Sequence, residues 1–201
     1  MTTVETPRLV LRHPCLNDEE AMVDVWTDAA VARFMDDFGP RTPTQVATWL
    51  REVCRTPEPH AGDRPGAVQF SVVERTNDVC AGWLGLGEST RCVAEWDFGY
   101  ALRPGRRGLG FMGEALDAAI AACRSSFGIE TFWGECHASN VASAATMLAA
   151  GLTEVECGDV GSRRFVTHPD LTTGQELQEK RHRHPAILKT SVGDAGPLSH
   201  A

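Results

Sequence analysis

The chain has 201 residues and a formal net charge of −8 at pH 7. This acidic balance argues against general affinity for nucleic acid or for anionic membrane surfaces. No apolar run approaches the ~20 residues of a membrane-spanning helix, and the N-terminal segment MTTVETPRLVLR lacks the hydrophobic core of an export signal. We therefore expect a cytoplasmic protein, with one domain over residues 1–170 and a polar, loosely ordered tail over residues 171–201.

The spacing of cysteines and histidines does not indicate a metal site. The seven cysteines are scattered without a C-x-x-C pair, and the histidines at 60, 137, 182 and 184 lack ligand spacing on a common element. An odd number of cysteines, several in apolar surroundings, is typical of small core side chains rather than of a disulfide framework. We expect no metal and no disulfide.

Two helices are predicted in the first third of the chain. Asn17 is the predicted N-cap of the first, with Glu20 at capping-box spacing and an apolar face that extends as far as Ala29. The second is predicted to begin after Thr42, because Pro43 follows directly and Gln45 completes a capping box.

Strands and two further helices are predicted along the rest of the chain. Seven short segments have the apolar or alternating pattern of strands, and they lie at 8–12, 68–73, 79–86, 94–102, 131–137, 152–157 and 164–168. Turn chemistry at Asn77 and Asp78 joins two of them as a hairpin. The helices are predicted over 109–127 and 140–150, with Gly151 as the stop signal of the second. This order predicts a mixed α and β domain without internal repeats.

The most informative segment runs from residue 96 to residue 113 and reads WDFGYALRPGRRGLGFMG. A β-prone stretch is followed by a turn with glycines at 105, 108 and 110 and arginines at 106 and 107, and an apolar helix begins at once. Backbone N–H groups of such a turn, together with the helix N-terminus, form a pocket for phosphate oxygens. The glycines permit close approach and the arginines supply positive charge. The segment therefore predicts a site for a phosphate or pyrophosphate group.

Two common phosphate motifs fit this segment poorly. A P-loop requires Lys followed by Ser or Thr directly after its glycines, and no such pair follows the glycines of this turn. Gly108, Gly110 and Gly113 do form a G-x-G-x-x-G pattern, as in dinucleotide-binding turns. That pattern should lie near the start of a βαβ unit with an acidic residue closing the next strand. Here it lies after a hairpin, and the next strand ends in Cys136–His137.

The run from Arg106 to Gly110 instead resembles the acetyl-coenzyme A pyrophosphate loop of the GNAT acyltransferases, written Q/R-x-x-G-x-G/A. The resemblance extends to the RimJ/RimL-like branch, whose members have segments similar to ETPRLVLR at 5–12 and CAGWLGLGE at 80–88. A G-Y step, here Gly99–Tyr100, ends the strand before the loop, and an N-x-x-S segment, here Asn140 to Ser143, follows the next strand. Together these motifs cover about residues 5 to 157, and their order and spacing make the resemblance specific.

This resemblance implies an α+β fold with a central, twisted, mostly antiparallel sheet of about seven strands flanked by helices. It implies acetyl-CoA as the acyl donor, with coenzyme A as the product. The residues that it places against the coenzyme are Phe98, Gly99, Tyr100, Ala101, Leu102, Gly105, Arg106, Arg107, Gly108, Leu109, Gly110, Phe111, Met112, Gly113, Asn140 and Ser143.

Two positions depart from the family pattern. The Q/R position of the loop falls on Gly105, so that Arg103, Arg106 or Arg107 would have to supply the charge near the phosphates. Many members also carry a helical tyrosine that protonates the departing thiolate, and that position falls on Met147, which has no proton to donate.

Acetyl transfer to an amine requires a base, an oxyanion site and a donor to the thiolate. The branch often has an acidic residue at Asp97, which we expect to act as base or to orient a water molecule. Glu95 lies two residues earlier on the same face of the strand, where two carboxylates could raise one another's pKa, although an acid at a strand edge is often only solvated. In the family's geometry, an interruption in the strand over residues 98–102 provides the oxyanion-binding N–H.

The N-x-x-S segment supplies the remaining candidates. The resemblance implies that Ser143 faces the coenzyme sulfur and replaces the missing tyrosine as donor. It also implies that Asn140 binds the pantetheine amides, whose donors and acceptors suit a carboxamide. Asn140 would equally serve as the N-cap of its helix, and both roles are compatible.

The acceptor is less clearly indicated. Acidic side chains in the N-terminal part form either a rim that attracts a cationic amine or the solvated face of a helix. Asp36 and Asp37, between apolar residues in FMDDFGP, are the candidate acceptor contacts. We expect N-acetylation of a small-molecule primary amine, with N-α-acetylation of a protein N-terminus or a non-catalytic acyl-CoA-binding module as alternatives. A homodimer is left open.

Overall fold

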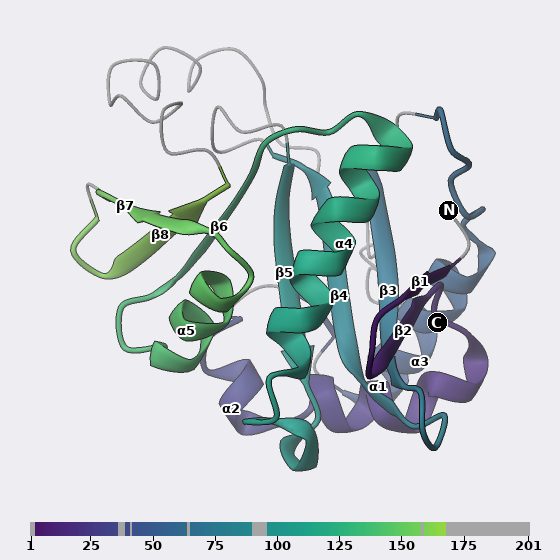
Figure 1. The fold of residues 1–201 in the computed structure, drawn as a ribbon. Helices are drawn as coiled ribbons and strands as arrows, with labels where there is room; N and C mark the ends of the chain where they lie inside the picture. The colour runs from purple at the N-terminus through teal and green to yellow at the C-terminus, as the bar shows by residue number, and fades with distance from the viewer. Residues whose placement is uncertain are drawn as a thin grey trace, which may run out of the picture.

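The computed structural model describes residues 3–35, 39–40, 42–63, 65–89, 96–157 and 159–167. Within these residues one sheet holds eight strands in the order β1-β2-β3-β4-β5-β6-β8-β7 (Figure 1). The strands are β1 (Thr3–Glu5), β2 (Leu9–Arg12), β3 (Ala67–Glu74), β4 (Cys80–Glu88), β5 (Trp96–Leu102), β6 (Phe132–His137), β7 (Thr153–Val155) and β8 (Ser162–Val166). All neighbouring pairs are antiparallel except β5 and β6. This confirms the predicted mostly antiparallel α+β fold, with one strand, the short β1, that the sequence pattern did not indicate.

Helices cover both faces of the sheet (Figure 1). They are α1 (Glu19–Trp26), α2 (Ala29–Ala32), α3 (Pro43–Arg55), α4 (Phe111–Phe127) and α5 (Val141–Ala149), with the 3-10 turns η1 (Leu16–Asp18) and η2 (Pro104–Arg106). The α4 and α5 layer encloses a core that includes Trp96, Leu116 and Phe132, and a second core behind the sheet includes Trp26 and Trp83. The sheet therefore separates two layers, and β5 borders both of them.

The predicted start of α3 is confirmed in detail. Thr42 Oγ1 accepts a hydrogen bond from the Gln45 N–H at 3.3 Å, and the Thr42 N–H donates to Gln45 Oε1 at 3.1 Å. The two turn predictions also hold, because Asp78 has φ of 57° in the β3–β4 turn and Gly151 has φ of 80° after α5. Left-handed backbone at Gly151 is the usual way for a helix to end.

The predicted start of the first helix is wrong. The chain enters α1 through the turn η1, and the capping box is formed by Cys15 and Asp18 rather than by Asn17 and Glu20. The helix also ends at Trp26, so that Ala29 begins the separate α2.

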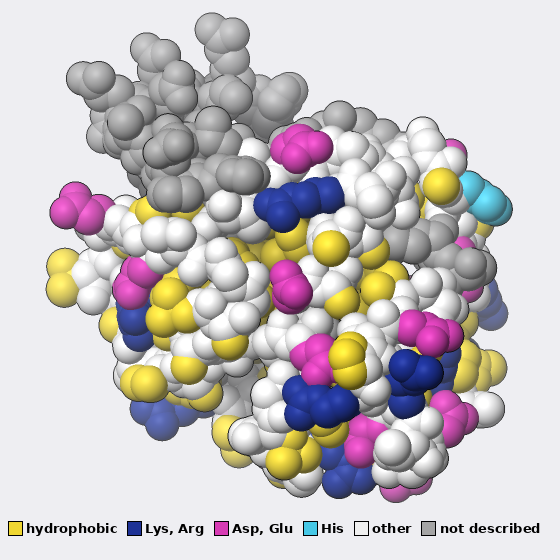
Figure 2. All heavy atoms as spheres, in the orientation of Figure 1, with side chains coloured by type: hydrophobic (Ala, Val, Ile, Leu, Met, Phe, Trp, Pro, Cys, Tyr) yellow, Lys and Arg dark blue, Asp and Glu magenta, His cyan; other side chains and the backbone are white. Residues whose placement is uncertain are grey.

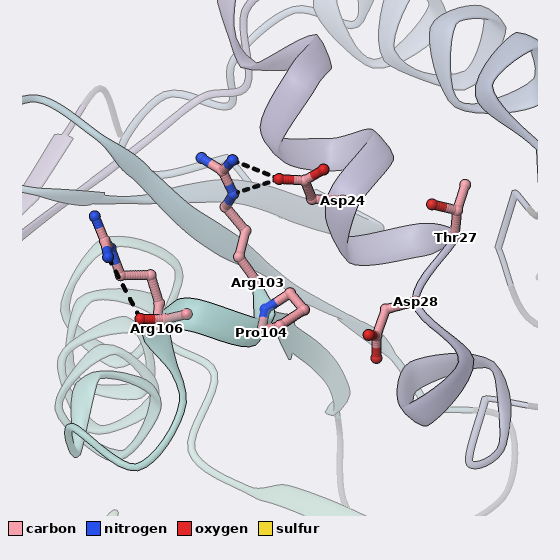
Figure 3. Close-up of a pocket in the computed structure, with 7 residues that line it drawn as sticks. Asp24, Thr27, Asp28, Arg103, Pro104 and Arg106 are labelled. Atoms are coloured by element: carbon pink, nitrogen blue, oxygen red, sulfur yellow. Dashed lines mark hydrogen bonds and ion pairs between the residues drawn. The ribbon is translucent and has the colours of Figure 1, made fainter.

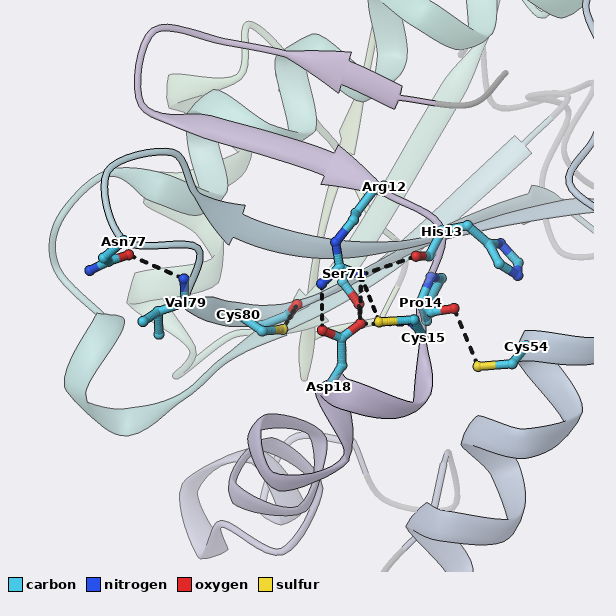
Figure 4. A network of polar contacts seen from close by, with 11 residues as sticks. Arg12, His13, Pro14, Cys15, Asp18, Cys54, Ser71, Asn77, Val79 and Cys80 are labelled. Carbon is cyan, nitrogen blue, oxygen red and sulfur yellow. Dashed lines mark hydrogen bonds and ion pairs between the residues drawn. The ribbon is translucent and has the colours of Figure 1, made fainter.

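The cause is a long-range contact of Asp18. Its carboxylate accepts hydrogen bonds from Arg12 at 2.7 and 2.8 Å and from Ser71 Oγ at 2.6 Å (Figure 4). Only 2% of the Asp18 side chain is exposed. Burial opposes its ionisation, but the hydrogen bonds from Arg12 and Ser71 outweigh burial and hold the pKa of Asp18 below its ordinary value. This carboxylate therefore ties η1 to β2 and β3 and sets where α1 begins.

The sheet opens between β5 and β6. These parallel strands share only two register pairs, Trp96 with Phe132 and Asp97 with Trp133. One residue beyond, the Phe98 ring lies against Gly134, where an added Cβ would fall 2.5 Å from the ring. The Phe98 ring thus packs against β6 on one face of the sheet, and β5 has no register pair with β6 beyond Asp97.

Candidate functional site

The open edge of β5 presents backbone groups in a fixed direction. The Trp96 N–H donates to Thr131 on the β6 side at 3.1 Å, whereas the Arg103 N–H donates to Ala81 of β4 at 2.9 Å. Because backbone groups alternate along a strand, those of Phe98, Tyr100 and Leu102 point into the opening. The β4–β5 register is continuous, so the interruption expected within this strand is absent from its pairing with β4; what ends early is its pairing with β6, after Asp97. Such N–H groups are what an oxyanion or a chain of amides needs.

The glycine turn leads from this edge into α4. Gly108 and Gly110 have φ of 73° and 75°, and Gly110 is the N-cap of α4, so the helix begins two residues later than predicted. A Cβ added at Gly105 or Gly108 would meet nothing within 4 Å. The first-turn N–H groups of any helix have no intrahelical acceptor, and here they adjoin an open turn. The phosphate prediction depends on this backbone arrangement, and phosphate binding to it stays a prediction.

The arginines around the turn all contact carboxylates. The pairs are Arg103 with Asp24, Arg106 with Glu74 and Arg107 with Asp28. Basic and acidic side chains accordingly lie next to one another over the lower part of the face in Figure 2. The hydrogen bond from Arg107, at 2.8 Å, is the main reason that the pKa of Asp28 lies below its ordinary value. That these arginines reach a phosphate stays a prediction.

A hollow of about 520 Å³ separates the turn from the end of α1 (Figure 3). Asp24, Thr27 and Asp28 line it on one side and residues 103–106 on the other. Arg103 crosses it, with Nε 2.9 Å from Asp24 Oδ2. The hollow is therefore polar and contains internally compensated charges.

Ser143 and Tyr100 meet across the opening. The Tyr100 hydroxyl lies 2.8 Å from Ser143 Oγ and 3.1 Å from the Ser143 carbonyl oxygen. The Tyr100 ring stacks on Phe98, with centroids 6.1 Å apart and planes 15° apart. Burial is the main cause that raises the pKa of Tyr100 above its ordinary value, so this phenol stays protonated. The sequence motifs did not indicate this pairing, because β5 and α5 meet only in the fold.

The structure also describes Asn140, which precedes α5, and Met147 within α5. Asn140 Oδ1 accepts a hydrogen bond from the Ser143 N–H at 3.1 Å, which makes Asn140 the N-cap that was one of its two predicted roles. Its contact with the coenzyme stays a prediction. Met147, at the family's tyrosine position, is 1% exposed, and its sulfur would lie 2.8 Å from a Cβ at Gly134. It belongs to the core.

Asp97 lies on the opposite face of β5 from Tyr100. Side chains alternate along a strand, and Phe98 and Tyr100 pack on the α4–α5 core while Ala101 packs on the core behind the sheet. Asp97 shares the second face and is partly exposed. Its predicted companion Glu95, and the predicted acceptor contacts Asp36 and Asp37, lie outside the described residues.

Two side chains that follow α2 lie over this second face. The Phe34 ring lies 6.1 Å from the ring of His137 on β6. The Met35 Cε would be 4.0 Å from a Cβ at Gly99. The segment after α2 therefore extends across the opening, from β5 to β6, on the side of Asp97.

An ion pair missed in the sequence fixes the start of α4. Arg8 Nε lies 2.6 Å from Glu114, and its Nη1 donates to the Leu109 carbonyl at 2.8 Å. The guanidinium also lies 5.0 Å from the centroid of the Phe111 ring. Burial opposes ionisation of Glu114, but hydrogen bonds from Thr6 and Arg8 hold its pKa below the ordinary value. Arg8 is part of the family-like segment at 5–12, yet its partner is 106 positions away.

In the part of the chain that the structure describes, no helix is long and apolar enough to cross a membrane. The same residues contain no group of three His, Cys, Asp or Glu side chains that could hold a metal ion.

A family model described as the acetyltransferase (GNAT) domain matches residues 8–153. The chain belongs to the GNAT acetyltransferases. The predicted family is thus confirmed, and with it the enzyme class, an acetyl-CoA-dependent N-acyltransferase. No curated protein sequence matches the chain significantly.

Solved GNAT structures share the fold at low sequence identity. An acetyltransferase from Bacillus anthracis has 16% identity and a TM-score of 0.65 over 82% of this chain and 96% of that one. RimL, the ribosomal L7/L12 α-N-protein acetyltransferase, in complex with coenzyme A, has 17% identity and a TM-score of 0.63 over 82% and 96%. The microcin C7 self-immunity acetyltransferase MccE, in complex with acetyl-CoA and AMP, has 15% identity and a TM-score of 0.59 over 80% of this chain and 92% of that one. At these identities the likeness shows a shared fold.

Proposed function

We propose that this GNAT acetyltransferase transfers the acetyl group of acetyl-CoA to the primary amine of a small molecule by direct attack. The observation that carries the proposal is that the candidate base and the candidate thiolate donor lie on opposite faces of β5. Asp97 lies on one face of the strand, Tyr100 and Ser143 lie on the other, and the open backbone edge lies between them. An amine and a thioester could therefore meet at the edge from opposite sides.

The coenzyme fits the residues that are present. The first-turn N–H groups of α4 and the open Gly105 and Gly108 would hold the pyrophosphate, and the edge over Phe98 to Leu102 would bind the pantetheine amides. Bound acetyl-CoA supplies an activated acyl group as a thioester.

Each residue has one step in the proposed mechanism. Asp97, directly or through a water molecule, removes a proton from the amine, whose nitrogen then bonds to the thioester carbon. A backbone N–H of β5 donates to the oxyanion. The oxyanion collapses, the C–S bond breaks with its electron pair on sulfur, and the amide nitrogen loses its remaining extra proton to water. Ser143 donates a hydrogen bond to the thiolate, which takes a proton from water after it leaves.

The segment after α2 favours a small acceptor. Phe34 reaches His137 and Met35 reaches Gly99, so side chains extend over the face from which the amine must approach. A peptide needs an open groove, whereas a small amine needs an enclosed pocket. The alternative acceptor, a protein N-terminus, is the substrate named for RimL.

A screen of thiol release tests the proposal. Purified full-length protein and acetyl-CoA are combined with a panel of small primary amines and with N-terminal peptides, and coenzyme binding is measured in parallel by calorimetry. Release with a small amine and none with peptides supports the proposal. Release only with peptides overturns the small acceptor, and tight binding without release would identify a non-catalytic acyl-CoA-binding module.

A further inference from the structure

The hydroxyl of Tyr100 has only one proton, and its possible acceptors are the two oxygen atoms of Ser143 and the side chain of Thr146. It lies 3.1 Å from the Ser143 carbonyl oxygen and 2.8 Å from Ser143 Oγ. If the phenol donates to the carbonyl, it can accept from the Ser143 hydroxyl, whose proton then points at Tyr100. If the phenol donates to Oγ, the serine proton is directed away from Tyr100, either toward the neighbouring Cys136 sulfur or into the opening. The two arrangements differ only in the rotation of two O–H bonds.

We propose that Tyr100 is a positioning residue that donates to Ser143 Oγ and thereby directs the serine proton at the sulfur of the departing coenzyme A. The inference rests on the proposed function, in which Ser143 faces that sulfur. Tyr100 would in this way compensate for the family's helical tyrosine, whose position in α5 is occupied by the buried Met147.

Tyr100 itself is not the source of the proton. Burial raises its pKa, whereas an ordinary thiol has a pKa of about 8.5, so proton transfer from the phenol to the thiolate would be uphill. Tyr100 and Ser143 both keep their protons in this scheme. The electron pair of the C–S bond stays on sulfur, the serine O–H stabilises that charge by a hydrogen bond, and the thiolate takes a proton from water after it leaves.

The local packing allows a clean test. Tyr100→Phe removes the hydroxyl and keeps the ring that stacks on Phe98. Ser143→Ala removes the proposed donor. A matched control is Ser125→Ala, because the Ser125 hydroxyl donates to the Ala122 carbonyl at 3.1 Å on the exposed end of α4 and is far along the helix from the turn. Thermal unfolding of each variant monitors the fold.

The first readout is turnover. We expect Tyr100→Phe to lower kcat about tenfold, with KM for acetyl-CoA within about twofold, as for a hydrogen bond that acts on developing charge. In the Ser143→Ala background the same substitution should have no further effect, and Ser125→Ala should match the wild type. If Tyr100→Phe retains full kcat, or lowers kcat equally when Ser143 is already alanine, Tyr100 does not act through the serine.

The second readout does not depend on turnover and separates this inference from the proposed function. A donor aimed at sulfur binds the thiolate better than the thiol, so the calorimetric affinity for coenzyme A should rise from about pH 7 to about pH 9, across the ordinary thiol pKa. Desulfo-coenzyme A should show no such rise. If the affinity for coenzyme A no longer increases with pH in both Tyr100→Phe and Ser143→Ala, the inference is supported even if no amine is acetylated. A rise that persists in Tyr100→Phe overturns it.

Discussion

The two sides of β5 differ in how their residues are assembled. On the coenzyme side, the strand edge, the glycine turn and the start of α4 follow one another between residues 98 and 113. On the acceptor side, Asp97 pairs with Trp133, and Gly99 on the same face lies near Met35 and Trp83, which come from distant parts of the chain. A site of contiguous residues can be located by a motif. A site assembled by tertiary packing varies with every surrounding element, which suits the part of an enzyme that selects its acceptor.

The largest effect is expected on the acceptor side, at Asp97. Asp97→Asn should lower kcat/KM by about 10²–10⁴-fold, because general base catalysis is worth that much, and should leave coenzyme affinity nearly unchanged. Steady-state kinetics and calorimetry measure the two quantities. Asp117→Asn, on the exposed face of α4, is the matched control. Unchanged turnover in Asp97→Asn would remove Asp97 from the mechanism.

The next largest effect is expected at Asp18, whose carboxylate holds η1 against β2 and β3. Asp18→Asn should lower the free energy of unfolding by ~3 kcal/mol, because it leaves Arg12 without its buried partner. Denaturant titration measures this loss. Glu5→Gln, whose carboxylate is 65% exposed beside Arg75, should change little.

The same carboxylate makes stability depend on pH in a predictable direction. The folded pKa of Asp18 lies below its unfolded value, so its contribution is complete above the unfolded pKa of about 3.9 and is lost as pH falls through the folded pKa. The fall in stability below about pH 4 should therefore be shallower in Asp18→Asn. An equal fall in both proteins would contradict a depressed pKa.

On the coenzyme side, two glycines provide a matched pair. Gly108 and Gly128 have φ of 73° and 68°, and a Cβ at either would meet nothing within 4 Å. Alanine at each should therefore cost about 1 kcal/mol of backbone strain. Only Gly108→Ala should also weaken coenzyme binding, by about tenfold, because its Cβ would lie where the phosphates are proposed to bind. Equal coenzyme affinities for the two variants would show that the turn is not the phosphate site.

The smallest effect is expected on coenzyme affinity when Arg107 is released from its carboxylate partner. Asp28→Asn keeps an N-cap on α2 but removes the charge that holds Arg107, and it should change stability by less than about 1 kcal/mol. Released Arg107 should raise coenzyme affinity about threefold at low salt and less at high salt. Adding Arg107→Gln should abolish the gain. If affinity does not respond, Arg107 serves only its structural partners, Asp28 and the Leu102 carbonyl.

Local signals account for what the sequence could predict. The capping box of Thr42 and Gln45, the turn at Asp78 and the glycine turn all depend on residues a few positions apart, and all are present in the structure. The family resemblance identified Ser143 and Asp97 without their surroundings. Whether those two residues act as predicted is a matter for the kinetics described above.

Long-range polar contacts account for what the sequence could not predict. The first helix begins later than predicted because Asp18 is held by a contact with Ser71, 53 positions away. Arg8 and Glu114 are 106 positions apart, and Tyr100 and Ser143 are 43 apart. Periodicity describes which face of an element is buried, and it contains no information about which charged or hydroxyl groups will meet there.

The two register pairs between β5 and β6 make the sheet a composite of two smaller sheets joined at a narrow seam. Coenzyme A in the proposed position would bridge β5 on one side of that seam and α5 on the other. Any ligand that binds only the joined form adds its binding free energy to the junction, about 2.7 kcal/mol at a concentration 100 times its dissociation constant. The acyl donor would then be a structural component of the sheet, and β7 and β8, far along the chain from the glycine turn, would gain protection against hydrogen exchange whenever the donor is bound.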